Sequence, residues 1–391
     1  MSHGFPELPG AAAVLEAALR QGAAPAASAA VRRGGELVHL SWAGAAQLVP
    51  ERRELGRADL FDVASLTKVM CTATAAALLV GEGSLALDEP AARRLPAFAA
   101  AGKERVTVRQ LLAHSSGLPK WRPYYERVRA DPVSGPAFLP PGRRPARLGP
   151  AFERGRALVE ELVCAEPLEA EPGARAVYGD PAFVALGLAL EAATGRRLDA
   201  LFGERVSGPL GLSDTFFVDE ARRGEGAAAP RSFAATERCE HRGEVNCGAV
   251  NDDNAYAAGG VAGHAGLFAS AADVAALGQA WLDALAGRRG MLDPAVAAEF
   301  ARRDPTPGST RALGWDTPTP GSSTLGLRLG RGPRGAIGHL GYTGCSLWID
   351  VDHEIVCALL TNHVHPSGRR PAELLSLRQR FHDAVGEAVG A

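Results

Sequence analysis

Lysine is nearly absent from this chain of 391 residues: only three of its 42 basic residues are lysines, and the others are arginines. Long apolar runs are missing too, since none reaches the ~18–20 residues that a membrane-spanning helix needs. There is no block of basic residues, and the formal net charge is −2. We therefore expect no membrane span and no nucleic-acid partner. What remains is the composition of an ordinary globular protein with ample core.

Cysteine is scarce and dispersed, with six residues at positions 71, 164, 239, 247, 345 and 357. This scatter fits reduced thiols better than a disulfide framework. The first ten residues lack the basic region and apolar core of a signal peptide. A cytoplasmic location is therefore expected.

One of the rare lysines, Lys68, stands three residues after Ser65 in the segment Ser-Leu-Thr-Lys. An ammonium group can lose its proton when it is desolvated, whereas a guanidinium cannot. A neutral lysine one helical turn from a serine hydroxyl can activate that serine as a nucleophile. Residues 66–80 are predicted to form a buried helix that Ser65 opens, where free backbone N–H groups favour developing negative charge. Ser65 is therefore the leading nucleophile candidate.

Strands are expected near both ends of the chain, with helices between them. The predicted fold class is α+β: an antiparallel sheet flanked by N- and C-terminal helices, with an inserted, mostly helical domain. Residues 1–80 and 275–391 are expected to form the sheet domain, and residues 81–274 the helical domain with long loops. The active site would lie at their interface. The predicted elements are helices 11–21, 181–194 and 371–388, a hairpin over 29–42 turning at Gly34-Gly35, a long loop over 131–150, and strands 324–330, 336–350 and 354–361.

Further segments follow Ser65 in a characteristic order. They are Leu-Leu-Ala-His-Ser-Ser-Gly-Leu-Pro (111–119), Tyr-Gly-Asp (178–180), Gly-His-Ala-Gly-Leu-Phe (263–268) and Gly-His-Leu-Gly (338–341). Together with Ser-x-x-Lys they resemble the serine β-lactamase and penicillin-binding-protein family, in its class C-like and esterase branch, over roughly residues 25–385. The resemblance implies a β-lactamase/transpeptidase-like fold and a serine hydrolase that works through an acyl-enzyme without a cofactor.

The resemblance also implies roles for three catalytic residues. Ser65 would be the acyl-accepting nucleophile and Lys68 its proton partner. Tyr178 would act with Lys68 as general base toward Ser65 and then as acid toward the leaving group. A neighbouring ammonium stabilises the phenolate that such a base requires.

Substrate-binding roles follow in the same way. His339 and Gly341 would line a strand beside the nucleophile, where the missing side chain of Gly341 would let a substrate approach. The backbone N–H groups of Ser65 and Tyr342 would form the oxyanion hole. His264, in a glycine-dense run, is a further expected substrate contact.

Two residues depart from the family pattern. Asp180 replaces the asparagine of Tyr-x-Asn, and His339 replaces the lysine that binds the carboxylate of β-lactams and of D-Ala-D-Ala. A mostly neutral imidazole anchors a carboxylate weakly near pH 7. This replacement and the missing export signal favour a carboxylesterase-like hydrolase of small ester or amide substrates. A D-Ala-D-Ala carboxypeptidase, a D-aminopeptidase and a weak β-lactamase remain alternatives. A non-catalytic binding protein that retains the pocket, which Asp180 would suit, is the alternative from another class; the oligomeric state stays open.

A zinc site is the competing interpretation of four other residues. Their spacing, Cys-x-His followed by a distant cysteine and histidine, matches no regular zinc module, so no metal is expected. These residues are Cys239, His241, Cys247 and His264.

Overall fold

The computed structural model describes residues 3–6, 8–223, 231–319, 323–367 and 371–391. Its main sheet has the strand order β1-β3-β2-β13-β12-β11, with β4 added to β3. Every neighbouring pair in it is antiparallel. The strands are β1 (His3–Pro6), β2 (Ala26–Arg33), β3 (Glu36–Gln47), β4 (Arg53–Glu54), β11 (Ala336–Leu340), β12 (Ser346–Asp350) and β13 (Ile355–Thr361). The two ends of the chain thus meet where β2 pairs with β13.

The hairpin predicted near the N-terminus is confirmed. Strands β2 and β3 are joined at Gly34 and Gly35, whose φ angles of 54° and 93° suit glycine. Strand β13 lies in the middle of the sheet, and all seven of its residues are buried. Its almost continuous apolar sequence follows from having helices on both faces of the sheet.

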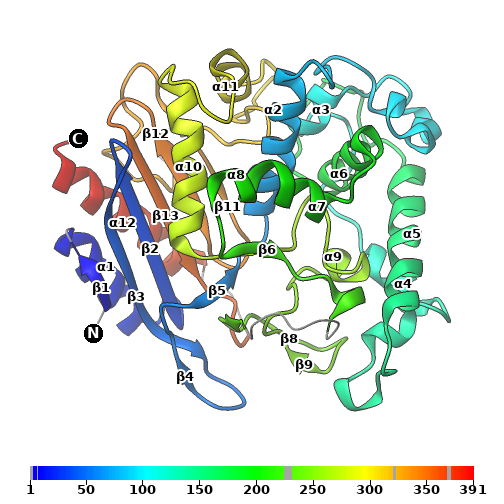
Figure 1. The fold of residues 1–391 in the computed structure, drawn as a ribbon, viewed down its shortest axis with the longest axis horizontal. Coiled ribbons are helices and arrows are strands. Elements are labelled where there is room, and N and C mark those ends of the chain that lie inside the picture. The colour runs from blue at the N-terminus through cyan, green and yellow to red at the C-terminus, as the bar shows by residue number, and fades with distance from the viewer. Residues whose placement is uncertain (1–2, 7, 224–230, 320–322, 368–370) are drawn as a thin grey trace.

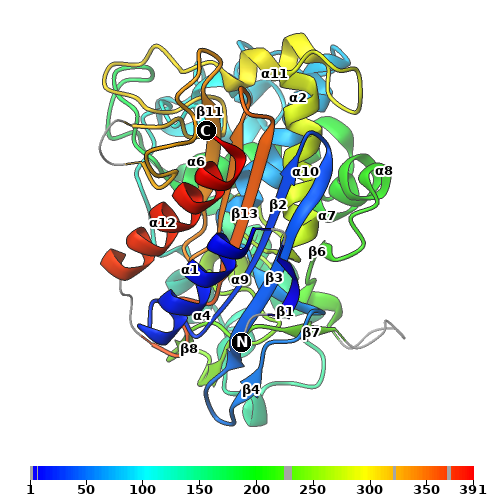
Figure 2. The ribbon, with the colours of Figure 1, turned by 90° about the vertical axis from the view of Figure 1, so that its left-hand side faces the viewer.

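Helices cover the two faces of this sheet. Helices α1 (Pro9–Arg20) and α12 (Pro371–Val389) pack together on one face, as Figure 2 shows. Helix α10 (Ala271–Leu285) lies across the other face, between the sheet and the helical part (Figure 1). A Cβ at Gly278 of α10 would come within 2.5 Å of the Val356 side chain on β13. The missing side chain therefore lets α10 pack closely against the sheet. The α+β fold with terminal helices flanking an antiparallel sheet is confirmed.

The middle of the chain is mostly helical. Its helices are α2 (Thr74–Gly81), α3 (Val108–Leu112), α4 (Tyr124–Ala130), α5 (Gly149–Ala165), α6 (Asp180–Thr194), α7 (Leu198–Phe202), α8 (Gly208–Leu210) and α9 (Asp253–Ala257), followed later by α11 (Pro294–Ala301). A second sheet has the order β6-β10-β5-β7, formed by β6 (Thr215–Phe217), β10 (Leu267–Ala269), β5 (Asp59–Asp62) and β7 (Ser232–Phe233); β8 (Arg238–Cys239) and β9 (Glu244–Val245) form a small hairpin.

The division of the chain near residues 81 and 274 stays a prediction. One cluster of buried apolar side chains runs from the sheet through the nucleophile-bearing helix into the helical part, and includes Leu347, Val69 and Leu186. Among the described residues, no helix combines the length and the apolar character needed to cross a bilayer.

Two predicted strands are wrong in detail. Residues 324–330 form turns, and the predicted strand 336–350 is two strands, β11 and β12. They are separated by a tight turn in which the Gly341 N–H donates to the Cys345 carbonyl at 2.7 Å and Gly344 has a φ of 110°. The long loop over 131–150 is present up to residue 148, with short 3₁₀ turns at Gly135–Phe138 and Pro141–Arg143.

Candidate active site

Ser65 stands at the junction between β5 and the helix that leads into α2. Val63, just after the end of β5, is still tied to β10, because its N–H donates to the Leu267 carbonyl at 3.1 Å. Ala64 then adopts a left-handed backbone conformation with a φ of 47°, which is uncommon for a residue with a side chain. The Asp62 carboxylate accepts the Ala64 N–H at 2.8 Å and supports this turn. Ser65 is consequently partly exposed while its neighbours along the chain are buried.

The helix that follows is not the ordinary α-helix predicted. Its first part, Lys68–Ala73, is a π-helical turn, which continues into α2. Two threonine hydroxyls stabilise the widened turn: Thr74 Oγ1 donates to the Val69 carbonyl at 2.7 Å, and Thr72 Oγ1 donates to the Gly263 carbonyl at 2.6 Å. π turns in helices are frequent at functional sites.

Lys68 is completely buried and has three hydrogen-bond acceptors. Its Nζ lies 3.0 Å from Ser65 Oγ, 2.7 Å from Asp180 Oδ1 and 3.3 Å from the His264 carbonyl oxygen. Burial alone would lower the pKa of Lys68, but Asp180 and Tyr178 together raise it above its ordinary value. The direction of this shift favours the ammonium form of Lys68. The neutral lysine considered from the sequence stays a prediction.

Tyr178 lies on the segment that precedes α6, and a turn at His114 positions that segment. The Val177 N–H donates to the His114 carbonyl at 2.8 Å, and the Gly179 N–H donates to His114 Nδ1 at 3.2 Å. The ring of Tyr178 has its centroid 5.1 Å from Lys68 Nζ. The structure thus brings Ser65, Lys68 and Tyr178 into one site.

His339 on β11 lies beside Tyr178, with ring centroids 5.7 Å apart. Its Nδ1 donates to the Leu340 carbonyl at 2.9 Å, and among the described residues Nε2 has no hydrogen-bond partner. Burial, followed by the nearby cations Arg311 and Lys68, holds the pKa of His339 well below its ordinary value. The imidazole is therefore neutral.

The turn after β11 lies against the residues before the nucleophile. A Cβ at Gly341 would come within 2.5 Å of the Val63 carbonyl oxygen, and Thr343 Oγ1 donates to the Asp62 carbonyl at 2.7 Å. A glycine at 341 is thus required by the protein's own backbone, and its predicted role in substrate approach stays a prediction. The side chain of Tyr342 is exposed, and its hydroxyl donates to Glu237 at 3.1 Å.

His264 points inward. Its side chain is 2% exposed, and Nε2 lies 2.9 Å from Asp252 Oδ1. Burial alone would raise the pKa of Asp252, but the attraction and hydrogen bond of His264 lower it. The carbonyl of His264 accepts from Lys68 Nζ at 3.3 Å, and the expected contact of the His264 side chain with a substrate stays a prediction. Asp252 was missed in the sequence, although the oxygen-rich run Asn-Asp-Asp-Asn at 251–254 was a signal for it.

Arg311 is a second residue of this site that the sequence did not reveal. Its Cζ lies 4.7 Å from the centroid of the Tyr178 ring, and its side chain is 22% exposed. It stands on an irregular segment with no motif around it. In a chain with so many arginines, nothing in the sequence distinguishes this one.

The side chains considered for zinc do not converge. Throughout the described ranges, no group of three or more histidine, cysteine or acidic side chains could hold a metal ion. Each has its own neighbour instead: Cys239 contacts Asp253, His241 contacts Arg129, Cys247 contacts the Phe233 carbonyl, and His264 contacts Asp252.

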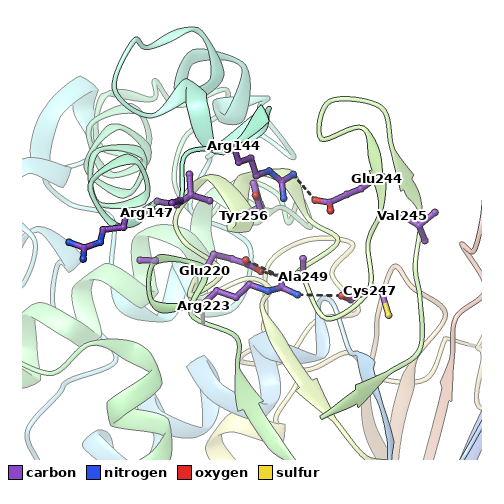
Figure 3. Close-up of a pocket in the computed structure, with 13 residues that line it drawn as sticks. Arg144, Arg147, Glu220, Arg223, Glu244, Val245, Cys247, Ala249 and Tyr256 are labelled. Atoms are coloured by element: carbon purple, nitrogen blue, oxygen red, sulfur yellow. Dashed lines mark hydrogen bonds and ion pairs between the residues drawn. The ribbon is translucent and has the colours of Figure 1, made fainter. Parts of the chain in front are cut away.

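A cavity of about 820 Å³ lies away from these residues, beside the start of α5 (Figure 3). Arginines and glutamates line it and pair with one another: Arg144 with Glu244 at 2.5 Å, and Arg223 with Glu220 at 3.1 Å. None of the predicted site residues lines this cavity. Its charges largely neutralise each other, and it adds nothing to the chemistry around Ser65.

Asp62, beneath Ser65, is expected to make stability depend on pH. Burial raises the pKa of Asp62 to about 6, although the N–H groups of Asn251 and Ala64 oppose the shift. Between pH ~4, the unfolded pKa, and pH ~6, the folded protein holds a proton that the unfolded chain releases. The free energy of unfolding should therefore fall as the pH rises through this window, by up to about 3 kcal/mol from this group.

Urea unfolding of the Asp62→Asn variant between pH 4 and 7 tests this expectation. As the pH is lowered from 7 to 4, the free energy of unfolding of wild type should rise relative to that of Asp62→Asn. Glu171→Gln, at an exposed position, is the control and should run parallel to wild type. Parallel curves for Asp62→Asn as well would contradict the assignment.

Comparison with known proteins agrees with this fold. A family model described as Beta-lactamase matches residues 11–379. The chain is 31% identical over 333 residues to N-acetylmuramyl-L-alanine amidase of Bacillus subtilis (strain 168), covering 80% of this chain and 70% of that protein. It is 30% identical over 329 residues to a putative D-alanyl-D-alanine carboxypeptidase of Escherichia coli (strain K12), covering 78% and 69%.

Solved structures give the same result for the fold. EstCE1, described as a hydrolase with promiscuous acyltransferase activity, superimposes with a TM-score of 0.70 at 21% identity, covering 96% of this chain and 98% of that one. A family VIII carboxylesterase gives a TM-score of 0.66 at 22% identity, covering 97% and 100%. The extent of the family match, over nearly the whole chain, shows that this protein belongs to the Beta-lactamase family.

Proposed function

We propose that this protein is a serine hydrolase that cleaves an ester or amide bond through an acyl-enzyme on Ser65. The observation that carries the proposal is the 3.0 Å contact between Lys68 Nζ and Ser65 Oγ, in a site where Lys68 has no exposed surface. A buried ammonium is costly unless it is paired. Its placement against a serine hydroxyl that remains partly exposed is difficult to explain by stability alone.

Proton transfer from Ser65 is assigned to Tyr178. Burial opposes the charge on Lys68, but Asp180 raises the pKa of Lys68 and so favours the ammonium over a neutral proton acceptor. Lys68 Nζ donates to Ser65 Oγ at 3.0 Å and lies 5.1 Å from the centroid of the Tyr178 ring. As Ser65 Oγ attacks the substrate carbonyl carbon, its proton passes to the Tyr178 oxygen, which then gives it to the leaving atom.

The remaining steps use the backbone around Ser65. The negative charge on the carbonyl oxygen is stabilised by the N–H groups of Ser65 and Tyr342, whose segments lie against each other at Gly341 and Val63. Collapse of this intermediate expels the leaving group and leaves an acyl ester on Ser65. Water then attacks the ester carbonyl carbon and gives a proton to Tyr178, which passes it to Ser65 Oγ as the bond between Oγ and the acyl carbon breaks. The carboxylic acid product leaves, and the Ser65 hydroxyl is restored.

A carboxylic ester is the first substrate class in this proposal. The neutral His339 offers no charge to hold a β-lactam carboxylate, which argues against efficient β-lactam hydrolysis. Amide hydrolysis is the second candidate. It is supported by the two curated relatives at 30–31% identity, one named an amidase and the other a putative carboxypeptidase.

Intact-protein mass spectrometry with three compounds tests the proposal. A fluorophosphonate should add one adduct, which peptide mapping places on Ser65, and p-nitrophenyl butyrate should be turned over. A stable adduct with a fluorescent penicillin would favour the carboxypeptidase alternative. If neither an adduct nor turnover were observed, the proposal would be wrong and the non-catalytic binding protein would remain.

A further inference from the structure

A buried arginine contacts the turn that carries one of the proposed oxyanion-hole donors. Arg378 stands on α12, and its side chain reaches the turn between β11 and β12. Its Nη2 donates to the Cys345 carbonyl at 2.7 Å and to the Gly341 carbonyl at 3.3 Å. The Gly341 N–H donates to the same Cys345 carbonyl, so the guanidinium and the backbone of the turn share one acceptor. The terminal helix thus holds this turn in place.

Arg378 is a buried cation without an acidic partner. Its residue is 7% exposed, and in the described part of the chain its guanidinium donates to carbonyl oxygens rather than to a carboxylate. Burial lowers the pKa of Arg378 to about 10, which still leaves it charged at neutral pH. Because a buried charge without a counter-ion is costly, stability alone gives no reason to place a cation against this turn.

One of the two carbonyls belongs to the peptide that holds the proposed donor. The Gly341 C=O and the Tyr342 N–H are the two ends of one planar trans peptide, so they point in opposite directions. A cationic donor at the carbonyl oxygen polarises the peptide, which makes the N–H at its other end a stronger donor. The close contact of Gly341 with the Val63 carbonyl keeps this peptide beside the segment that carries Ser65.

We infer that Arg378 is a positioning residue for catalysis, which acts through the peptide between Gly341 and Tyr342 to stabilise the oxyanion. The inference rests on the proposed function, in which the N–H groups of Ser65 and Tyr342 receive this oxygen. When Ser65 Oγ bonds to the carbonyl carbon, an electron pair of the C=O bond moves to the oxygen and the serine proton passes to Tyr178. The oxygen carries more charge then than in the bound ester. A polarised donor therefore lowers the barrier more than it strengthens substrate binding.

Replacing Arg378 by methionine tests the inference through kcat and KM. Methionine fills much of the same space without the charge, and apolar replacement of a buried charge is often tolerated. Acylation and deacylation both pass through an oxyanion, so kcat for p-nitrophenyl butyrate should fall while KM stays nearly constant. We expect about a 10-fold loss, a fraction of the ~10²–10³-fold that removal of a whole donor costs. Arg378→Lys, which keeps a cationic donor, should lose no more than about threefold.

A boronic acid separates this role from support of the fold. Ser65 Oγ adds to the boron of propylboronic acid and its proton passes to Tyr178, which leaves a negatively charged tetrahedral adduct with an oxygen in the oxyanion hole. In Arg378→Met the inhibition constant should rise by the same factor as kcat/KM falls. Calorimetry should show that p-nitrophenyl butyrate binds Ser65→Ala and Ser65→Ala/Arg378→Met equally well.

Two substitutions on the same helix are the controls. Phe381→Leu, in the core, should lower the melting temperature and leave the inhibition constant unchanged. Arg380→Met, at an exposed position, should behave as wild type in every measurement. If Arg378→Met does not fold, Arg378→Gln removes the charge and keeps an amide donor, and its loss should lie between those expected for lysine and methionine.

The outcomes distinguish the inference from the proposed function. An active wild type with unchanged kcat and boronate inhibition in Arg378→Met, or in Arg378→Gln in its place, would overturn the inference alone. Equal losses of boronate affinity in Phe381→Leu would also overturn it, because Arg378 would then only support the fold. A wild type that neither reacts with fluorophosphonate nor binds the boronate would overturn the proposed function and the inference with it.

Discussion

Replacing Ser65 by alanine is expected to lower the turnover of butyrate esters by at least about 10⁴-fold and to remove the fluorophosphonate adduct. The methyl group cannot form the acyl-enzyme, and residues that act as a unit lose most of their effect when one is removed. Folding should be little affected, since the Ser65 side chain is partly exposed and, within the described part of the chain, accepts a hydrogen bond from Lys68 Nζ. Steady-state kinetics and intact-mass spectrometry on the same preparation measure both effects.

Ser213→Ala, at an exposed serine outside the site, is the matched control. It should keep both the adduct and the turnover of wild type. If Ser65→Ala were to retain more than about a hundredth of the wild-type rate, another nucleophile would have to be sought.

The second large effect is expected from Lys68→Arg, which keeps the positive charge. We expect kcat/KM to fall about 10³-fold, in the range of lost proton-transfer and electrostatic assistance. The ammonium reaches three acceptors from a space with no exposure to solvent, and the larger, planar guanidinium cannot take up the same contacts. Overpacking should also cost about 1–3 kcal/mol of stability, which thermal unfolding measures separately from activity.

Another of the three lysines, Lys120, provides a matched control for this experiment. Lys120 is exposed, and its backbone carbonyl accepts the Asp180 N–H at 3.1 Å, so it borders the site without placing its side chain there. Lys120→Arg should stay within about twofold of wild type, as surface substitutions usually do. A Lys68→Arg variant that folds and is as active as Lys120→Arg would rule out a specific need for an ammonium.

Local patterns predicted the parts of the fold that local chemistry decides. Paired glycines at 34 and 35 indicated the first hairpin, and Pro181 and Gly195 bounded a helix that the structure places at Asp180–Thr194. The order of the family segments predicted that Ser65, Lys68 and Tyr178 would meet. This prediction was possible because the comparison with a family uses the order of the segments, even though the segments lie far apart along the chain.

Interactions between distant parts of the chain could not be read in this way. The charge state of Lys68 depends on Asp180, whose carboxylate only the folded chain brings to within 2.7 Å. The close contact of Gly341 with Val63 and the position of Arg311 over Tyr178 likewise arise only in the folded chain. The single strand expected over 336–350 was wrong because residues 341–345 form a tight turn closed by the hydrogen bond from the Gly341 N–H to the Cys345 carbonyl.

The widened turn over Lys68–Ala73 has a consequence for how relatives of this protein are aligned. A π turn contains one more residue than an α turn, so the helix that begins at Leu66 can gain or lose a residue there while both of its ends keep their neighbours. The catalytic end and the packed end of the helix are thus free to differ in spacing between homologues. Against a relative whose helix lacks the extra residue, an alignment without a gap here would place the positions after Ala73 one residue out of register. It would then compare Thr74, which is bonded to Val69 and Trp281, with the wrong residue.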